Sequence, residues 1–279
     1  MSDKRILIFG SMGTIADEVE RSLVALGADV ARVPFEQRKF RDEWGYGRAL
    51  RNAVAQFSPD IILPVGCQKA MASLVEEFPG IFIPVSSRAT IDLLESKVQS
   101  TLYAGSIGLR IPDLYSIDRP GEIPEGEVIF KRDSSVGGSG VHRPRTLDAL
   151  VRLIDHELGK PYLIERYIEG ADVSVDCVRL PGKVVAMSSY ISLGRLQTQG
   201  PSSQRRIIKC PEAERQASLL LDSLDYRGVC GLDFRIGDPV EREGIIEGTP
   251  YFLECNPRFT GGLRTQIDSG FDLPRLLVG

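Results

Sequence analysis

Histidine is scarce in this sequence, and the cysteines show none of the spacings that signal a metal site or a disulfide framework. The 279 residues include two histidines, His142 and His156, which are too few for a histidine-based metal centre. The five cysteines are odd in number, widely spaced and contain no C-x-x-C pair. Neither a zinc site nor a set of disulfides is therefore indicated, and we predict a reducing, cytoplasmic location.

Long hydrophobic runs and a basic excess are also missing. No apolar stretch approaches the roughly 20 residues that a membrane-spanning helix needs. The N-terminus, MSDKRILIFG, lacks the long apolar segment of a signal peptide. A formal net charge of −4 with 42% hydrophobic residues is ordinary for a soluble globular protein. We therefore predict neither a membrane nor a nucleic acid as a partner.

The first 88 residues alternate between strand and helix patterns. Buried-type strands are predicted at 5–10, 29–34, 60–64 and 81–85, and helices at 15–26, 49–56 and 67–77. Such alternation is typical of a small doubly wound parallel sheet. The turn after the first strand, GSMGTI, lacks the third glycine of G-x-G-x-x-G. A nicotinamide-dependent oxidoreductase is therefore kept only as an alternative.

Chemistry concentrates in residues 251–262, which read YFLECNPRFTGG. Residues two apart along a strand share a face, so Glu254 and Asn256 present two oxygen ligands side by side. Hard cations such as Mg²⁺ take carboxylate and carbonyl oxygens and keep part of their shell for phosphates. Pro257 ends the strand, and the planar cation of Arg258 can then hold a phosphoryl group. The plainer interpretation is an edge strand with a solvated glutamate.

This stretch resembles the E-[IMC]-N-P-R motif of the ATP-grasp superfamily, and further matches follow in the expected order from about residue 90 to 262. The resemblance implies an N-terminal doubly wound parallel sheet, followed by a two-lobed ATP-grasp fold that binds ATP between two α+β lobes. Domain limits of 1–88, 89–160 for the small lobe and 161–279 for the large lobe follow from it.

Two lysines and a glycine-rich loop carry the resemblance in the small lobe. Lys97 precedes G-S-I-G-L-R-I-P, as at the entry to the family's nucleotide domain, although a solvated helix lysine fits equally well. Lys131 ends an apolar strand before a Ser/Gly loop similar to K-P-x-x-G-S-G-S-x-G-V, with Arg132 and Asp133 in place of Pro-x. Backbone N–H groups of such loops can bind phosphate oxygens, and a flexible hairpin is the alternative. The loop residues implied in nucleotide binding are Ser135, Gly137, Gly138, Ser139 and Gly140.

The resemblance also assigns roles in residues 161–279. The backbone at Glu165, Arg166, Tyr167 and Ile168 would meet the adenine, and Asp172 would meet the ribose. A plain β-hairpin is the alternative for this segment. Asp233, which points away from its apolar neighbours, would be the third metal ligand beside Glu254 and Asn256. The polar segment 192–206, with three arginines, is predicted to be a loop, of a kind that often holds substrate carboxylates.

The function implied is a carboxylate–amine (or carboxylate–thiol) ligase of the carbamoyl-phosphate-synthase-like branch. It would use ATP and Mg²⁺, or Mn²⁺, to make an acyl phosphate, with Lys131 and Arg258 as catalytic cations. Small-molecule carboxylates and amines would be its partners, and a homodimer is one option for its assembly. The alternative from another class is a non-catalytic ATP-binding or scaffold protein that has kept the pocket.

Overall fold

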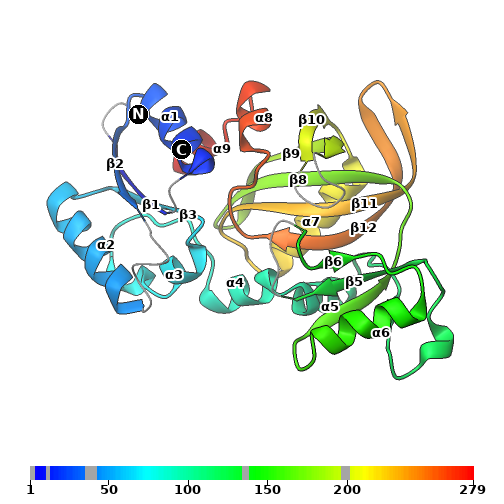
Figure 1. Ribbon diagram of the computed structural model, residues 1–279. Helices are drawn as coiled ribbons and strands as arrows, with labels where there is room; N and C mark the ends of the chain where they lie inside the picture. The colour runs from blue at the N-terminus through cyan, green and yellow to red at the C-terminus, as the bar shows by residue number, and fades with distance from the viewer. Residues whose placement is uncertain (1–3, 11–12, 35–42, 134–137, 196–201) are drawn as a thin grey trace.

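The computed structural model describes residues 4–10, 13–34, 43–133, 138–195 and 202–279. A three-stranded parallel sheet lies at one end of the molecule, and antiparallel sheets of four and five strands form the other end (Figure 1). This arrangement confirms the predicted fold class, a parallel α/β unit followed by two α+β lobes.

The N-terminal domain is a doubly wound sheet with strand order β2-β1-β3. Its elements are β1 (Arg5–Gly10), α1 (Thr14–Ala25), β2 (Asp29–Pro34), α2 (Glu43–Phe57), β3 (Ile61–Val65), α3 (Gln68–Ala72) and the 3-10 turn η1 (Val75–Glu77). Alternate residues of β1 face opposite sides, as the strand period requires. Ile6 and Ile8 pack in the apolar cluster of α1, whereas Leu7 and Phe9 pack in the cluster that holds α2 and α3.

The strand predicted at 81–85 is wrong. Phe82 forms an isolated parallel bridge with Ile61. Its backbone hydrogen bonds are with Asp60 and Ile62, and this pairing is too short to form a strand. Pro84 follows two residues later and has no N–H to donate, so the ladder cannot continue.

Two helices lead from this domain into the small lobe, α4 (Arg88–Glu95) and α5 (Lys97–Ser106). Each begins at a serine whose side chain accepts a backbone hydrogen bond, Ser87 from Thr90 and Ser96 from Gln99. Such caps satisfy N–H groups that the helix itself cannot. Lys97 is therefore the first residue of α5 rather than a residue on the flank of a longer helix.

The small lobe is a sheet of order β4-β7-β5-β6 with α6 on one face. Its elements are β4 (Leu114–Tyr115), the 3-10 turn η2 (Pro120–Glu122), β5 (Val128–Arg132), β6 (Val141–His142), α6 (Leu147–His156) and β7 (Tyr162–Arg166). Strand β7 pairs with both β4 and β5. Strand β7, which follows residue 160, therefore shares a sheet with the elements that precede it.

The large lobe is an antiparallel sheet of order β10-β9-β8-β11-β12. Its elements are β8 (Ala171–Leu180), β9 (Lys183–Arg195), β10 (Ser202–Ile208), α7 (Pro211–Ser223), β11 (Gly228–Arg242) and β12 (Ile245–Asn256). Strands β9 and β10 correct the loop predicted over 192–206, since its two ends pair with each other and only 196–201 lie outside the described residues.

Gly170 lies in the connection between the two lobes. Its φ is 148°, and a Cβ there would lie 1.9 Å from the carbonyl oxygen of Ile236. Only glycine fits such a position, because an added methyl would overlap the backbone of β11.

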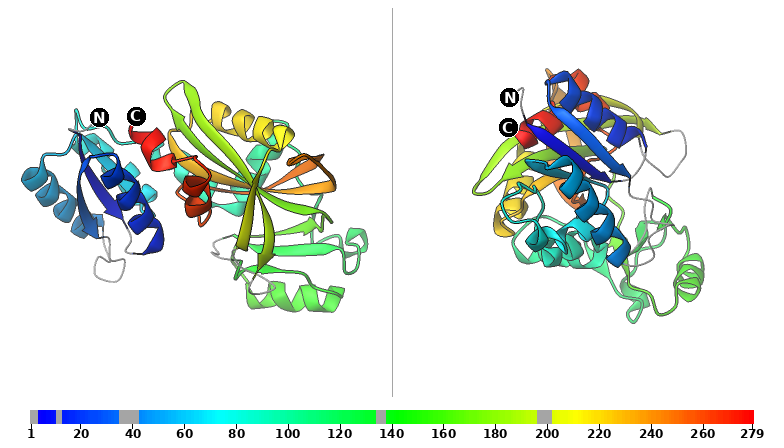
Figure 2. Two further views of the ribbon diagram at one scale, coloured as in Figure 1. Left: turned by 90° about the horizontal axis from the view of Figure 1, so that it is seen from above. Right: turned by 90° about the vertical axis from the view of Figure 1, so that its left-hand side faces the viewer.

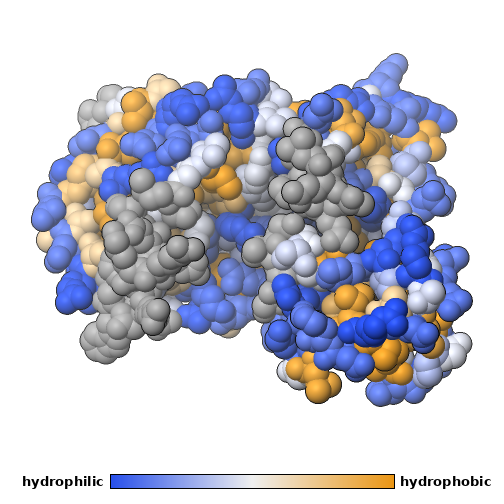
Figure 3. All heavy atoms as spheres, viewed as in Figure 1, coloured by the Kyte–Doolittle hydropathy of each residue, from blue (hydrophilic) through white to orange (hydrophobic). Residues whose placement is uncertain are grey.

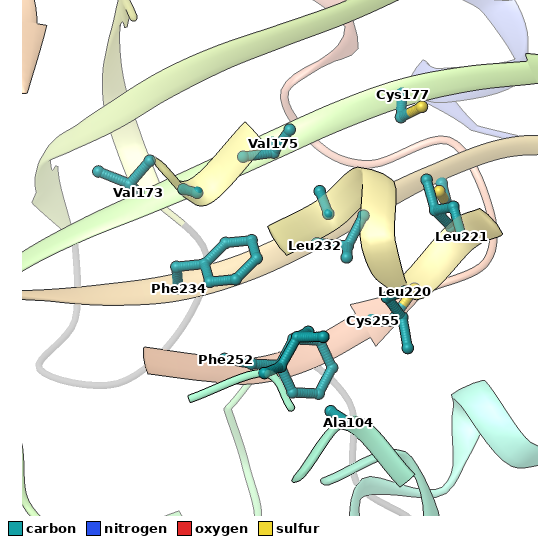
Figure 4. Close-up of a cluster of buried hydrophobic side chains, with 14 of the residues drawn as sticks. Ala104, Val173, Val175, Cys177, Leu220, Leu221, Leu232, Phe234, Phe252 and Cys255 are labelled. Atoms are coloured by element: carbon teal, nitrogen blue, oxygen red, sulfur yellow. The ribbon is translucent and has the colours of Figure 1, made fainter. Parts of the chain in front are cut away.

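The core of the large lobe fills the space between its sheet and helices α5 and α7 (Figure 4). Leu232 and Phe234 of β11 point into this core, and Phe234 meets Phe252 of β12 edge to face with ring centroids 6.0 Å apart. Because strand neighbours face opposite sides, the core residues leave Asp233 on the other face of the sheet.

Two short helices return the chain to the N-terminal domain, α8 (Leu263–Asp268) and α9 (Leu273–Val278). Leu273 and Leu277 share an apolar cluster with Val19 of α1, and the Ser22 hydroxyl donates to Asp272 at 2.6 Å. Figure 2 shows the red C-terminal helix beside the blue N-terminal elements.

Hydrophilic residues cover much of the face in Figure 3, with smaller groups of hydrophobic side chains between them. Among the described helices none has the length and apolar character to cross a membrane.

Candidate active site

A cavity of about 430 Å³ lies between the small and large lobes. Its volume falls in the range of small-molecule sites. The predicted site residues that line it are Lys97, Lys131, Gly138, Glu165, Arg166, Tyr167, Ile168, Asp172, Asp233, Glu254, Asn256 and Arg258. Side chains predicted from separate motifs therefore meet in one place.

Two carboxylates and an amide occupy neighbouring strands on one wall. Asp233 of β11 and Glu254 of β12 are register partners, and the Asn256 amide nitrogen lies 3.3 Å from an oxygen of each. The Ser174 hydroxyl donates to Asp233 at 2.5 Å. The amide nitrogen thus bridges two acids that would otherwise repel each other.

The two acids titrate differently. Burial and the charge of Glu254 raise the pKa of Asp233 to about 7. Burial opposes ionisation of Glu254 as well, but the charges of Lys97 and Lys131 outweigh it and lower the pKa of that carboxyl. Glu254 is thus the anion of the pair, and a cation bound between them would favour ionisation of Asp233 too.

The two predicted lysines enter the cavity from different elements. The Lys97 ammonium lies 3.4 Å from Glu254, and the Lys131 ammonium lies 2.5 Å from Glu165. Glu165 is 2% exposed, and burial raises its pKa. The second oxygen of Glu165 has no hydrogen-bond partner in the described part of the chain. Lys131 is therefore held by a buried acid at the edge of the cavity.

The connection between the lobes supplies part of the opposite wall. The N–H groups of Arg166 and Tyr167 donate to the carbonyls of Asp113 and Glu127, so neither is free for a ligand. Of the segment predicted to meet a base, the Ile168 N–H makes no bond with a described residue. The Arg143 guanidinium lies 3.4 Å from the centroid of the Tyr167 ring and fixes it by a cation–π contact.

The glycine-rich loop is described in part. Gly138 lines the cavity, and its carbonyl accepts from Val141 in a tight turn. Ser139 and Gly140 belong to that turn and do not line the cavity; the Gly140 carbonyl accepts from Arg132. Ser135 and Gly137 lie outside the described residues.

Asp172, predicted to meet a ribose, lines the cavity and pairs with Arg235 at 3.0 Å. A carboxylate paired with one guanidinium can still accept hydrogen bonds from hydroxyl groups on its other lone pairs.

Several other lining residues were not named as site residues from the sequence. Tyr190, Ser192 and Arg205 come from the β9–β10 hairpin, and Thr260 follows Arg258. Ile15 enters from α1 of the N-terminal domain. The three arginines in 192–206 were the available signal, but the hairpin register that turns Arg205 inward cannot be read from the sequence.

Comparison with proteins of known structure shows the same architecture over nearly the whole chain. The biotin carboxylase domain of Hydrogenobacter thermophilus 2-oxoglutarate carboxylase, determined with MgADP, ADP and bicarbonate, superposes with a TM-score of 0.71 at 18% identity. That match covers 99% of this chain and 68% of the carboxylase domain. L-amino acid ligase from Bacillus licheniformis gives 0.69 at 16% identity, covering 100% of this chain and 74% of the ligase.

The chain has the ATP-grasp fold. Residues 159–279 match the family model described as "ATP-grasp in the biosynthetic pathway with Ter operon". The large chain of carbamoyl phosphate synthase from Thermoanaerobacter sp. (strain X514) is 28% identical over 137 residues, 44% of this chain. That match spans 12% of the synthase chain. Residues 159–279 are therefore similar to this ATP-grasp family, and the chain as a whole shares the fold of the carboxylase and ligase structures.

The residues of this ATP-grasp cavity fit a divalent cation. Among the described residues no three His, Cys, Asp or Glu side chains form a metal cluster, so a site here depends on the Asn256 amide. An amide has a carbonyl end as well as an NH₂ end, so Asp233, Glu254 and Asn256 can offer three oxygens. Oxygen donors in this number suit Mg²⁺ or Mn²⁺ with phosphate oxygens completing the shell.

Proposed function

We propose that the protein is an ATP-dependent carboxylate–amine (or carboxylate–thiol) ligase that works through an acyl phosphate and forms ADP and phosphate. The observation that carries the proposal is the meeting of Asp233, Glu254 and Asn256 with Lys131 and Arg258 in one cavity of an ATP-grasp fold. A divalent cation on the first three would neutralise phosphate charge.

The positively charged side chains of the cavity have two roles: some bind the nucleotide phosphates, and one binds the phosphoryl group in transfer. Lys131, paired with Glu165, and Lys97, paired with Glu254, would bind the nucleotide phosphates. Arg258 lies just after β12, and its guanidinium forms no ion pair with a described residue. It is therefore available to the group in transfer, as a planar cation suited to phosphoryl oxygens.

The reaction balances with no group on the protein forming a covalent bond. An oxygen of the substrate carboxylate attacks the γ-phosphorus of ATP, the bond to the β-phosphate oxygen breaks, and ADP leaves. The amine then attacks the acyl carbon, phosphate leaves with the electron pair of the C–O bond, and the proton lost by the amine passes to phosphate or water. Positioning and charge neutralisation supply the catalysis.

The small-molecule partners and a cytoplasmic location belong to the same proposal. All five cysteines are buried thiols without disulfide bonds, which supports a reducing compartment.

The products of ATP test the mechanism. With a pool of carboxylates and hydroxylamine as the nucleophile, we expect ADP and phosphate in equal amounts together with a hydroxamate. AMP and pyrophosphate would show adenylation and contradict the acyl phosphate. Tight Mg-ATP binding without turnover on any acid would favour the non-catalytic alternative.

A further inference from the structure

Two adjacent arginines on β10 have opposite surroundings. Arg206 is exposed and forms a paired set of bonds with Glu241, at 2.6 and 2.7 Å. Arg205 lines the cavity, and its Nε is buried without a hydrogen-bond partner in the described part of the chain. A buried donor without a partner is costly, so a side chain kept in this state is expected to have a ligand.

The position of Arg205 is set by the β9–β10 hairpin. Ser192 is its register partner, and the guanidinium carbon lies 5.8 Å from the centroid of the Tyr190 ring. Its Nη2 is 3.4 Å from where a Cβ on Gly261 would be. Tyr190, Ser192 and Gly261 all line the same cavity. The side chain is thus packed along the wall, with its polar end directed at the space rather than at solvent.

The charges around the cavity single out two cations. Four of the lining cations pair with carboxylates: Lys97 with Glu254, Lys131 with Glu165, Arg166 with Asp113, and Arg235 with Asp172. Arg205 and Arg258 form no ion pair with a described residue. The adjoining segment 196–201, LQTQGP, contains no acidic residue.

The charge of Arg205 acts on the Asp176 carboxyl group, but the two side chains form no ion pair. The Asp176 carboxylate accepts from Thr260 at 3.0 and 3.1 Å and from Gln266 at 3.4 Å, and it is 1% exposed. These bonds occupy it within the protein, which leaves the Arg205 guanidinium for a group in the cavity.

Arg205 and Arg258 are close enough to hold one small molecule. Arg205 lies against Gly261, which is three residues after Arg258. Three residues of chain span at most about 11 Å. Arg258 therefore lies at the end of β12, and Arg205 lies a short distance along the same wall of the cavity.

We propose that Arg205 binds a second, non-reacting carboxylate of the acid substrate, so that the acid activated in this site is a small dicarboxylate. The inference rests on the proposed function and adds to it the substrate class. One carboxylate lies at Arg258, where phosphoryl transfer takes place, and the other accepts the fork of Arg205 donors, whose geometry matches a carboxylate.

The test compares diacids with their monoamides on the protein loaded with Mg-ADP. Succinate, glutarate, aspartate and glutamate are titrated calorimetrically against succinamate, glutaramate, asparagine and glutamine. We expect at least one diacid to bind tenfold or more tightly than its monoamide. Arg205→Met should weaken that diacid by about 10- to 100-fold, the range of a lost charge-assisted pair. It should leave the affinities for the monoamide and Mg-ADP within about twofold.

Arg206→Met is the matched control, because it removes the neighbouring arginine from the outer face of the same strand, and it should change none of these affinities. Arg205→Lys keeps the charge but not the fork and should restore part of the diacid affinity; it also serves if Arg205→Met fails to fold.

Three results would overturn the inference. Equal binding of every diacid and its monoamide would show that no second carboxylate is recognised. Diacid binding unchanged by Arg205→Met would remove Arg205 from the site, and a large loss of Mg-ADP affinity would assign Arg205 to the nucleotide. Failure of the wild-type protein to bind Mg-ADP at all is a separate outcome, which rejects the proposed function itself.

Discussion

Glu254 faces both Lys97 and the Asn256 amide, and its charge is central to the proposed cation site. Glu254→Gln removes one negative charge with almost no change in shape. We expect turnover to fall by at least 100-fold, because losing several kcal/mol of charge stabilisation costs about tenfold per 1.4 kcal/mol. Phosphate release measures this effect.

The control is Glu247→Gln, an exposed glutamate on the same strand. It should retain full turnover, and both variants should keep the wild-type circular dichroism spectrum. Near-normal turnover by folded Glu254→Gln would remove Glu254 from the set of metal ligands.

The buried Asp176 carboxyl group should make the unfolding free energy depend on pH. Burial is the main cause that raises its pKa from 3.8 to about 7. A folded-state pKa above the unfolded value means that the native protein holds the proton more tightly. Its contribution to the unfolding free energy is therefore complete below about pH 4 and is lost as the pH rises through 7. At 1.36 kcal/mol per pKa unit, the full loss is about 4 kcal/mol.

Asp176→Asn cannot titrate and should show a smaller decline between pH 4 and 8 than the wild type, because Asp233 still titrates in this range. Urea unfolding at a series of pH values measures the difference. Asp238→Asn, at an exposed position with φ of 49° that asparagine tolerates, should keep the wild-type slope. Parallel pH profiles for wild type and Asp176→Asn would contradict a raised pKa.

Gly170 controls how two strands are connected, because it lies between β7 of one lobe and β8 of the other. Gly170→Ala places a methyl 1.9 Å from the Ile236 carbonyl oxygen at a φ of 148°. We expect a loss of about 3 kcal/mol or more in unfolding free energy, from backbone strain and displacement of β11 together. Denaturant unfolding would measure it.

Gly121→Ala is the comparison, since an added Cβ there meets nothing within 4 Å. It should change stability by less than about 0.5 kcal/mol, as is usual for surface positions. A Gly170→Ala variant as stable as Gly121→Ala would show that the connection between the lobes can relax freely.

Nucleotide binding is expected to stabilise the whole molecule against unfolding. Binding to the native state alone stabilises it by about 2.7 kcal/mol at 100 times the dissociation constant. We therefore expect Mg-ADP or Mg-ATP to raise the melting temperature and NADH to leave it unchanged. A shift with NADH and none with Mg-nucleotide would favour the oxidoreductase alternative and contradict nucleotide binding between the lobes.

Local patterns predicted some of these features and missed others for a physical reason. Strand alternation placed Asp233, Glu254 and Asn256 on the face opposite the core, and the structure brings them together in the cavity. Nothing local places Arg205 beside Gly261, because that contact depends on the β9–β10 register and on the path of a segment about 55 residues away.

The errors have the same origin. Residues 81–85 look like a strand by composition, but Pro84 interrupts the pairing. The apolar strand β7 has the same local character whether it pairs in the small or the large lobe, and its partners β4 and β5 decide the matter. Strand composition can be read from sequence, whereas strand partners depend on the rest of the chain.

The packing of α9 on α1 has a consequence for biosynthesis. Ser22 and Asp272, which join the two helices, are 250 residues apart. At about 5–20 residues per second, a ribosome takes roughly 12–50 s to make the intervening chain. Throughout that interval the cluster of Ile6, Ile8 and Val19 lacks Leu273 and Leu277. This apolar cluster is therefore completed only after the chain of both lobes has been made, and until then the face that Leu273 and Leu277 cover stays open.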